Sequence, residues 1–240
     1  LTALVSLGAR HRAVYLASID GDETFDSQSP NVIASFELAA VVMSALLVVA
    51  KQGAASSDVA LTIRNEKVLD MITEVLSDEK TLHAVKKGTR EAIVRSWVHS
   101  TYIRAHAVLY SFARYHESLR AKLNEVVVAA IHTVSCGAVL CDATSRISRA
   151  WIVSTLSLLL ADTAQRNLLT ENVIMISNVI EIARSEAAAP TSLLQDNRDM
   201  GQPSTSPLPG TTAKNLVWCF YHASRVPRKK TRIALQDAIC

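Results

Sequence analysis

The residues whose types and spacing best suit metal binding are one histidine and two cysteines in the middle of the chain. His132 and Cys136 stand four residues apart, so a helix would place them on one face, and Cys141 follows five residues later. An imidazole and two thiolates could supply three zinc ligands. However, the spacing through Gly137 matches no standard zinc module and no fourth ligand is evident, whereas free cysteines are common in buried apolar helices. We therefore expect no metal and no cofactor here.

Motifs of the common enzyme classes are absent from the sequence. The 7 glycines form neither a dinucleotide-binding nor a P-loop pattern. There is no Gly-x-Ser-x-Gly turn and no His-Glu-x-x-His pair. The 7 histidines have no carboxylate at a sequence spacing that would indicate a catalytic pair, and we expect most of them on helix surfaces. They are His11, His83, His99, His106, His116, His132 and His222. The sequence thus predicts a protein without enzymatic activity.

The densest run of positive charge lies in residues 225–232. It contains five basic residues: Arg225, Arg228, Lys229, Lys230 and Arg232. Such a run could contact nucleic acid, anionic lipid or an acidic partner, or act as a nuclear import signal. The chain as a whole has 25 basic and 22 acidic residues, a net charge of only +3, which gives no reason to expect general nucleic-acid binding. We favour a solvated loop between two helices and keep these residues as a possible basic contact.

The composition predicts long helices that would position these residues. Hydrophobic residues make up 49% of the chain and aromatic residues only 5%, with 7 Gly and 6 Pro, which favours closely packed helices over a β-sandwich. The longest apolar run, residues 38–50, is too short for a membrane span, which needs about 20 residues. Four scattered cysteines fit a reducing compartment, so we expect a cytoplasmic protein, with nuclear or cytoskeletal association as an alternative.

A loose pattern recurs about four times along the chain. An apolar helix, such as residues 104–113 or 149–161, is followed by a polar break at 120–125 or 165–171 and by a second apolar helix at 126–134 or 173–182. Recurrence at a few tens of residues indicates stacked helical units with one continuous core. An acidic residue precedes each second helix and serves as the anchor of the register: Glu66, Glu125, Glu171 and Asp237.

We expect one domain over residues 1–240. Residues 1–19 should form a helix and Pro30 should begin another. Residues 186–212, rich in Pro, Ser and Thr, should be a flexible loop within the domain. Because the chain lacks an initiator Met and stops in an expected helix, we expect a fragment of a longer protein.

Three segments resemble armadillo repeats or the closely related HEAT repeats. Residues 148–159 (SRAWIVSTLSLL) look like the second helix of an armadillo unit, and residues 165–173 (QRNLLTENV) are similar to the break before its third helix. Residues 120–127 (RAKLNEVV) repeat that form. The resemblance covers roughly residues 31–240, although the glycine and proline that commonly open the third helix are missing. It implies an all-α, right-handed solenoid of about four irregular repeats.

The resemblance also implies a concave groove lined by the third helices, where a protein or peptide partner would bind. Seven residues beyond three of the anchors stand polar residues, and two more lie one turn further on, so the expected groove contains Thr73, His132, Ser135, Asn178 and Glu181. The alternative is that these residues are simply the solvated side of amphipathic helices. The resemblance therefore predicts a non-enzymatic scaffold or adaptor.

Two other functions stay open from the sequence. The chain could be a regulatory or targeting domain of a larger enzyme, or an all-α bundle that binds lipid or a small molecule in a cavity lined by residues 38–50. Nuclear-signal recognition of the importin-α kind is not expected, because Trp151 and Trp218 are followed four residues later by Thr155 and His222 rather than by Asn. We expect both tryptophans to be packing residues of outer helices. The sequence gives no oligomeric state.

Overall fold

The computed structural model describes residues 30–52, 68–77, 92–135, 142–188 and 211–225, and this part of the chain is almost entirely helical, with no strand. The all-α class predicted from composition is confirmed for these residues. The helices are α2 (Pro30–Gln52), α4 (Val68–Leu76), α6 (Ala92–Tyr115), α7 (Arg120–Ser135), α8 (Asp142–Ala161), α9 (Thr163–Glu171), α10 (Val173–Ala188) and α11 (Thr211–Ser224), with a 3₁₀ turn η2 (Glu117–Leu119) before α7.

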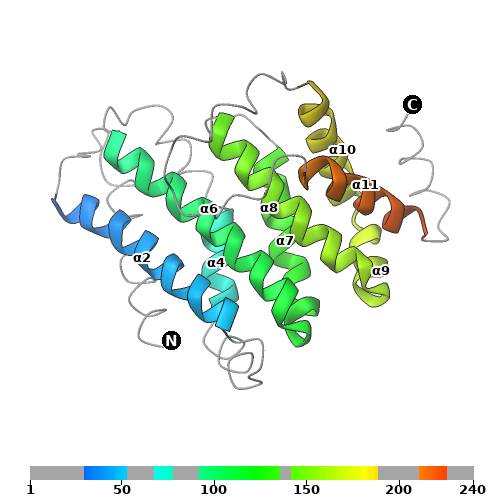
Figure 1. Ribbon diagram of the computed structural model, residues 1–240, viewed down its shortest axis with the longest axis horizontal. Coiled ribbons are helices and arrows are strands. Elements are labelled where there is room, and N and C mark those ends of the chain that lie inside the picture. Colours follow the sequence, from blue (N-terminus) through cyan, green and yellow to red (C-terminus); the bar gives the residue numbers. More distant parts are fainter. Residues whose placement is uncertain (1–29, 53–67, 78–91, 136–141, 189–210, 226–240) are drawn as a thin grey trace.

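The described helices form two layers (Figure 1). The front layer of that view contains α2, α6, α8 and α11, which lie side by side in chain order. Behind it, α7 packs against α4 on one side and α10 on the other, again in chain order. Short α9 joins α8 of the first layer to α10 of the second and contacts both. The chain therefore passes back and forth between two rows of helices.

One continuous apolar core lies between the two layers. Both rows supply residues that are fully buried in it, among them Leu46 of α2, Ile72 of α4, Phe112 of α6, Ile131 of α7 and Ile152 of α8. Removing an aliphatic or aromatic side chain of this size from water contributes about 1.5–3 kcal/mol. The core therefore depends on contacts between the helices of the two layers.

The predicted break at residues 165–171 is wrong, because these residues belong to helix α9. The side chain of Asp162 accepts hydrogen bonds from the backbone N–H groups of Ala164 (2.9 Å) and Gln165 (3.3 Å), and so caps the start of α9. The side chain of Asn172 accepts from the N–H of Met175 at 3.0 Å and caps the next helix in the same way. The real breaks are thus the single residues Asp162 and Asn172.

The predicted break at residues 120–125 is also wrong, because these residues lie inside α7. The chain turns earlier, at His116 and η2, where the N–H of Leu119 donates to the carbonyl oxygen of His116 at 3.0 Å. Glu125 consequently lies within a helix, whereas Glu171 ends one. The acidic anchors do not mark the same structural point in each unit.

Two boundaries of the predicted loop at residues 186–212 need correction. Helix α10 continues to Ala188, and Glu186 accepts a 2.8 Å hydrogen bond from the Arg149 guanidinium, which fixes α10 against α8. Helix α11 begins at Thr211. Residues 189–210 between them, the predicted helix at 1–19 and the anchors Glu66 and Asp237 lie outside the described residues. The predicted helix start at Pro30 is confirmed.

Candidate functional site

Two of the five residues predicted for the groove meet on the surface. The side-chain amide of Asn178 on α10 lies 3.5 Å from Nδ1 of His132 on α7, and both side chains reach solvent. The amide can donate this hydrogen bond when the imidazole proton is on Nε2, which leaves Nδ1 as the acceptor. The two residues are 46 positions apart in the sequence, so neighbouring helices present polar side chains at one point of the α4/α7/α10 layer.

The spacing of 46 positions between His132 and Asn178 also relates residues that have the same structural role in α7 and in the α9–α10 pair. Leu123 and Leu169 are both buried in the core. Arg120 Nε donates at 2.9 Å to the carbonyl oxygen of Ala113 near the end of α6, and Arg166 Nε donates at 2.9 Å to that of Leu160 near the end of α8. Each guanidinium thereby satisfies a carbonyl of the preceding long helix. The register predicted from the sequence therefore holds here, although the predicted breaks do not.

The other three groove residues make mainly local contacts. Thr73 is half-buried and its hydroxyl donates to the carbonyl oxygen of Leu69, one turn back in α4, at 2.8 Å. Ser135 donates to the carbonyl oxygen of His132 at 2.8 Å. Glu181 is exposed and lies 3.7 Å from Arg184 on the same helix, a surface pair that contributes little. The structure thus joins His132 to Asn178, with Ser135 and Glu181 one turn away on the same helices.

Of the five predicted basic residues, only Arg225 lies in the described part of the chain. It is exposed just beyond α11, and its guanidinium lies 5.6 Å from the centre of the Tyr221 ring. Arg228, Lys229, Lys230 and Arg232 lie outside the described residues.

The two tryptophans differ, and the prediction that both are packing residues is wrong for one of them. Trp151 of α8 packs against the core, with its ring centre 5.2 Å from that of Tyr110. Trp218 of α11 is 45% exposed, because Leu216 and Cys219 on the other side of the helix are the residues that face the core. Sequence reasoning missed this exposed aromatic residue.

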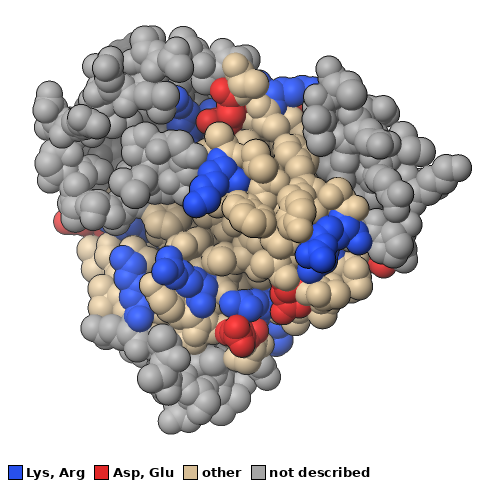
Figure 2. All heavy atoms as spheres, turned by 45° about the vertical axis from the view of Figure 1, so that its right-hand side comes forward, with Lys and Arg blue, Asp and Glu red and all other residues tan. Residues whose placement is uncertain are grey.

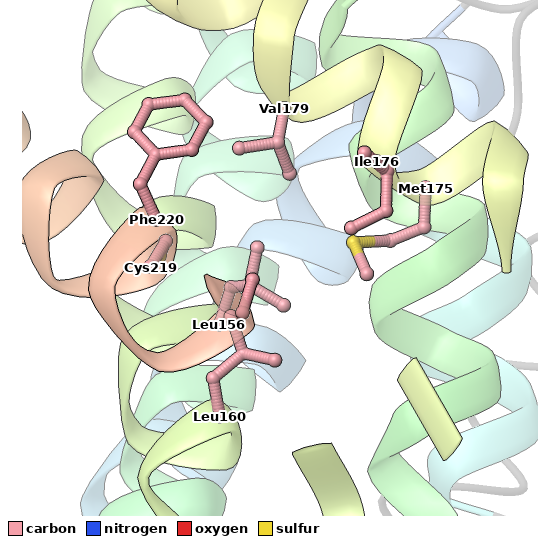
Figure 3. Close-up of a pocket in the computed structure, with 8 residues that line it drawn as sticks. Leu156, Leu160, Met175, Ile176, Val179, Cys219 and Phe220 are labelled. Carbon is pink, nitrogen blue, oxygen red and sulfur yellow. The ribbon is translucent and has the colours of Figure 1, made fainter. Parts of the chain in front are cut away.

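An apolar hollow lies between α8, α10 and α11 (Figure 3). The side chains around it are all apolar apart from one thiol: Leu156, Leu160, Met175, Ile176, Val179, Cys219, Phe220 and Ala223. The hollow has a volume of about 10 Å³, no more than one water molecule needs, and it offers no polar partners for one. The apolar side of α2, predicted in one alternative to line a cavity, packs against α6 instead. The hollow between α8, α10 and α11 is therefore too small for a small-molecule ligand.

The chemically reactive side chains nearest to the core are shielded. Burial raises the pKa of the Cys219 thiol, which donates weakly to the carbonyl oxygen of Val153 at 3.7 Å. A thiol held neutral in this way is a poor nucleophile. Burial also lowers the pKa of His106 to about 3, and neither ring nitrogen of His106 has a hydrogen-bond partner. Neither group is arranged for catalysis.

Two of the five histidines in the described part of the chain are buried. His106 is fully enclosed, with its ring edge-on to Tyr102 at 4.8 Å between ring centres. His116 lies 3.2 Å from the carbonyl oxygen of Ala50, through Nε2, and so links the turn before η2 to the end of α2. Both have structural roles.

The residues that the structure describes contain neither a cluster of metal ligands nor a membrane-spanning helix. Within these ranges, no group of three or more His, Cys, Asp and Glu residues is placed to hold a metal ion, and Cys136 and Cys141 lie outside them. No helix that the structure describes is both long enough and apolar enough to cross a membrane.

The armadillo or HEAT resemblance stays a prediction. The two-layer order, the buried leucines at equal offset and the contact between His132 and Asn178 fit it, but none of these features is specific to one family. Comparison with protein-family models, with curated proteins and with solved structures found no match to this chain.

Proposed function

We propose that the chain is a non-enzymatic scaffold or adaptor of stacked armadillo- or HEAT-like units, which binds a protein or peptide on the outer face of the α4/α7/α10 layer. The observation that carries this proposal is the contact between His132 and Asn178, because it places polar side chains from two successive units next to each other on that face. A cytoplasmic location and right-handed stacking of the units belong to the same proposal.

The binding mechanism follows from the way the helices are held. Buried contacts join the two layers, and the ion pair between Arg149 and Glu186 fixes α10 on α8. A surface built on such helices loses little conformational freedom when a partner binds, so many modest contacts can add up to useful affinity. Arrays of stacked repeats bind along extended surfaces for this reason.

The test is a double substitution that adds charge to this face without touching the core. His132→Glu combined with Asn178→Glu should abolish capture of specific partners from the source cell, while the helical circular dichroism signal and the unfolding temperature stay close to those of the wild type. A photo-crosslinking amino acid at position 181 of the wild-type chain should attach to the same partner.

A matched control adds the same charge elsewhere. Val48 of α2 and Asn167 of α9 are both exposed, so Val48→Glu combined with Asn167→Glu should leave capture unchanged. Loss of partners in both double variants, or in neither of them, would contradict the proposed binding face.

A further inference from the structure

One side of α11 carries a line of exposed aromatic and basic residues. Lys214, Trp218, Tyr221 and Arg225 are spaced four, three and four positions apart, so they lie along one face of the helix. Trp218 is 45% exposed and Tyr221 49% exposed, and both basic side chains are exposed. We call these four residues the α11 stripe. The opposite side of the helix faces α8 and α10, so the stripe is not needed for packing.

The aromatic part of the stripe is already ordered. The rings of Trp218 and Tyr221 meet edge to face, with centres 5.5 Å apart. The imidazole of His222 stacks on Trp218 at 5.6 Å, and the Arg225 guanidinium lies 5.6 Å from the centre of the Tyr221 ring. Rigid Trp, Tyr and Arg side chains are the residues that most often dominate binding energy at protein interfaces. Because they are held in place before binding, little entropy is lost when a partner arrives.

The charged residues of helix α11 and of the chain directly after it, up to Asp237, have one sign. Helix α11 contains no Asp or Glu, and the sequence has no acidic residue between Asp199 and Asp237 but six basic ones. Lys214 and Arg225 are eleven positions apart, so about 16 Å of helix separates them. No ion pair is formed by either of them within the described part of the chain. In Figure 2, which brings the end with α10 and α11 forward, basic side chains cover more of the face than acidic ones do. A complementary partner would therefore be acidic.

The form of the stripe favours a protein segment over nucleic acid. Bases stack on open ring faces, and one face of each ring is already occupied, by His222 on Trp218 and by Arg225 on Tyr221, which reduces the surface left for stacking. Val217, next to Trp218, is 67% exposed and adds an aliphatic surface that a nucleic acid would not use. Two cations at the ends of an aromatic centre suit a peptide that has apolar residues between carboxylates.

We propose that the α11 stripe is a docking site for an acidic protein segment that carries apolar side chains between its carboxylates. This site is separate from the face formed by His132 and Asn178, and the inference does not depend on that face having a partner. The carboxylates would pair with Lys214 and Arg225, and the apolar side chains would cover Trp218, Tyr221 and Val217.

The experiment measures binding of defined probes to the full chain by fluorescence anisotropy. The first probe is a labelled synthetic peptide in which Glu residues flank a Leu-Phe-Leu centre, and the second has Lys in place of every Glu. A poly-dT oligonucleotide and phosphatidylserine vesicles serve as the third and fourth probes. We expect the Glu peptide to bind, the Lys peptide to bind at least about tenfold more weakly, and the other two probes to bind more weakly than the Glu peptide.

Variants then test whether the stripe is the binding site. Trp218→Ala should weaken binding of the Glu peptide about tenfold or more. Lys214→Glu combined with Arg225→Glu should reverse the preference, so that the Lys peptide binds more tightly than the Glu peptide. His132→Glu combined with Asn178→Glu should leave the affinity for the Glu peptide unchanged. The proposal is overturned if no Glu peptide binds, if Trp218→Ala has no effect, if the charge reversal does not change the preference, or if the oligonucleotide or the vesicles bind more tightly than the Glu peptide.

Discussion

The buried imidazole of His106 should make the stability of the protein depend on pH. The ring is fully enclosed, both of its nitrogens lack hydrogen-bond partners, and burial lowers its pKa from 6.5 to about 3. Below pH 6.5 the unfolded chain binds a proton at this site that the folded chain does not bind. The free energy of unfolding is therefore highest above pH 6.5 and falls as the pH is lowered towards 3.

The size of this effect follows from the difference between the two pKa values. Each pH unit below 6.5 costs about 1.4 kcal/mol, so acidification from pH 7 to pH 5 should remove about 2 kcal/mol of stability through His106 alone. The assay is urea unfolding followed by circular dichroism at several pH values between 7 and 5. The dependence on urea concentration should keep its slope, because the buried surface does not change.

The variant His106→Leu isolates the contribution of the imidazole. Leucine removes two unsatisfied polar atoms at a similar volume, so stability at pH 7 should stay the same or rise, and most of the loss at pH 5 should disappear. His222→Leu is the comparison, because the pKa of His222 is also lowered, by partial burial and by the positive charges of Arg166 and Arg225, but its ring is less enclosed. If His106→Leu lost as much stability between pH 7 and pH 5 as the wild type does, the reasoning would be refuted.

Three further alanine substitutions, each with a comparison variant, test a helix cap, a buried hydrogen bond and an ion pair. Asp162→Ala removes the cap of α9 and should cost about 1 kcal/mol in the free energy of unfolding from urea titration, whereas Asp162→Asn should restore most of it. Asn124→Ala breaks the buried 2.6 Å hydrogen bond from Asn124 Nδ2 to Gln165 and should cost about 1–3 kcal/mol, while Asn124→Leu combined with Gln165→Leu should cost less than the single change. Arg149→Ala leaves the Glu186 carboxylate partly buried without its partner and should lower the unfolding temperature, which Arg149→Lys should partly recover.

Helical content and most helix positions could be predicted from the sequence because they depend on local patterns. The apolar run at residues 149–161 lies within α8, and the run at 173–182 lies within α10. Few glycines and prolines interrupt these segments, so apolar residues at helical spacing were sufficient signals. Handedness and repeat family depend instead on how whole units stack, which no local pattern specifies.

The ends of helices were harder to predict, because a single capping side chain can separate two helices. Residues 165–171 are polar enough to suggest a break, yet Asp162 at their start and Asn172 at their end satisfy the free N–H groups of α9 and α10. A run of three or four polar residues is not needed for a turn when one residue can cap. The motif that would have indicated this is Asp162 followed by a helix-favouring segment, read as an N-cap rather than as part of a loop.

Exposure of side chains on α11 could not be inferred from the sequence, because it depends on which side of the helix meets the neighbouring layer. The helix is apolar on more than one side, with Leu216 and Cys219 as suitable for the core as Val217 and Trp218. Packing against α8 selects the first pair and leaves the second on the surface. The signal that could have pointed to an exposed face is the spacing of Lys214 and Arg225, since two charged residues on the same side of a helix as a tryptophan are poorly placed for burial.

The contact between His132 and Asn178 shows why the register could be right while the breaks were wrong. The positions that agree lie inside the helices, where a leucine enters the core and an arginine satisfies the end of the preceding helix. Leu123 and Leu169 do the first, and Arg120 and Arg166 do the second. Between these positions the chain can pass from one layer to the other by a 3₁₀ turn or by a short helix without changing the register. His132 and Asn178, at equal offset from these positions, therefore meet, although different turns precede the helices that carry them.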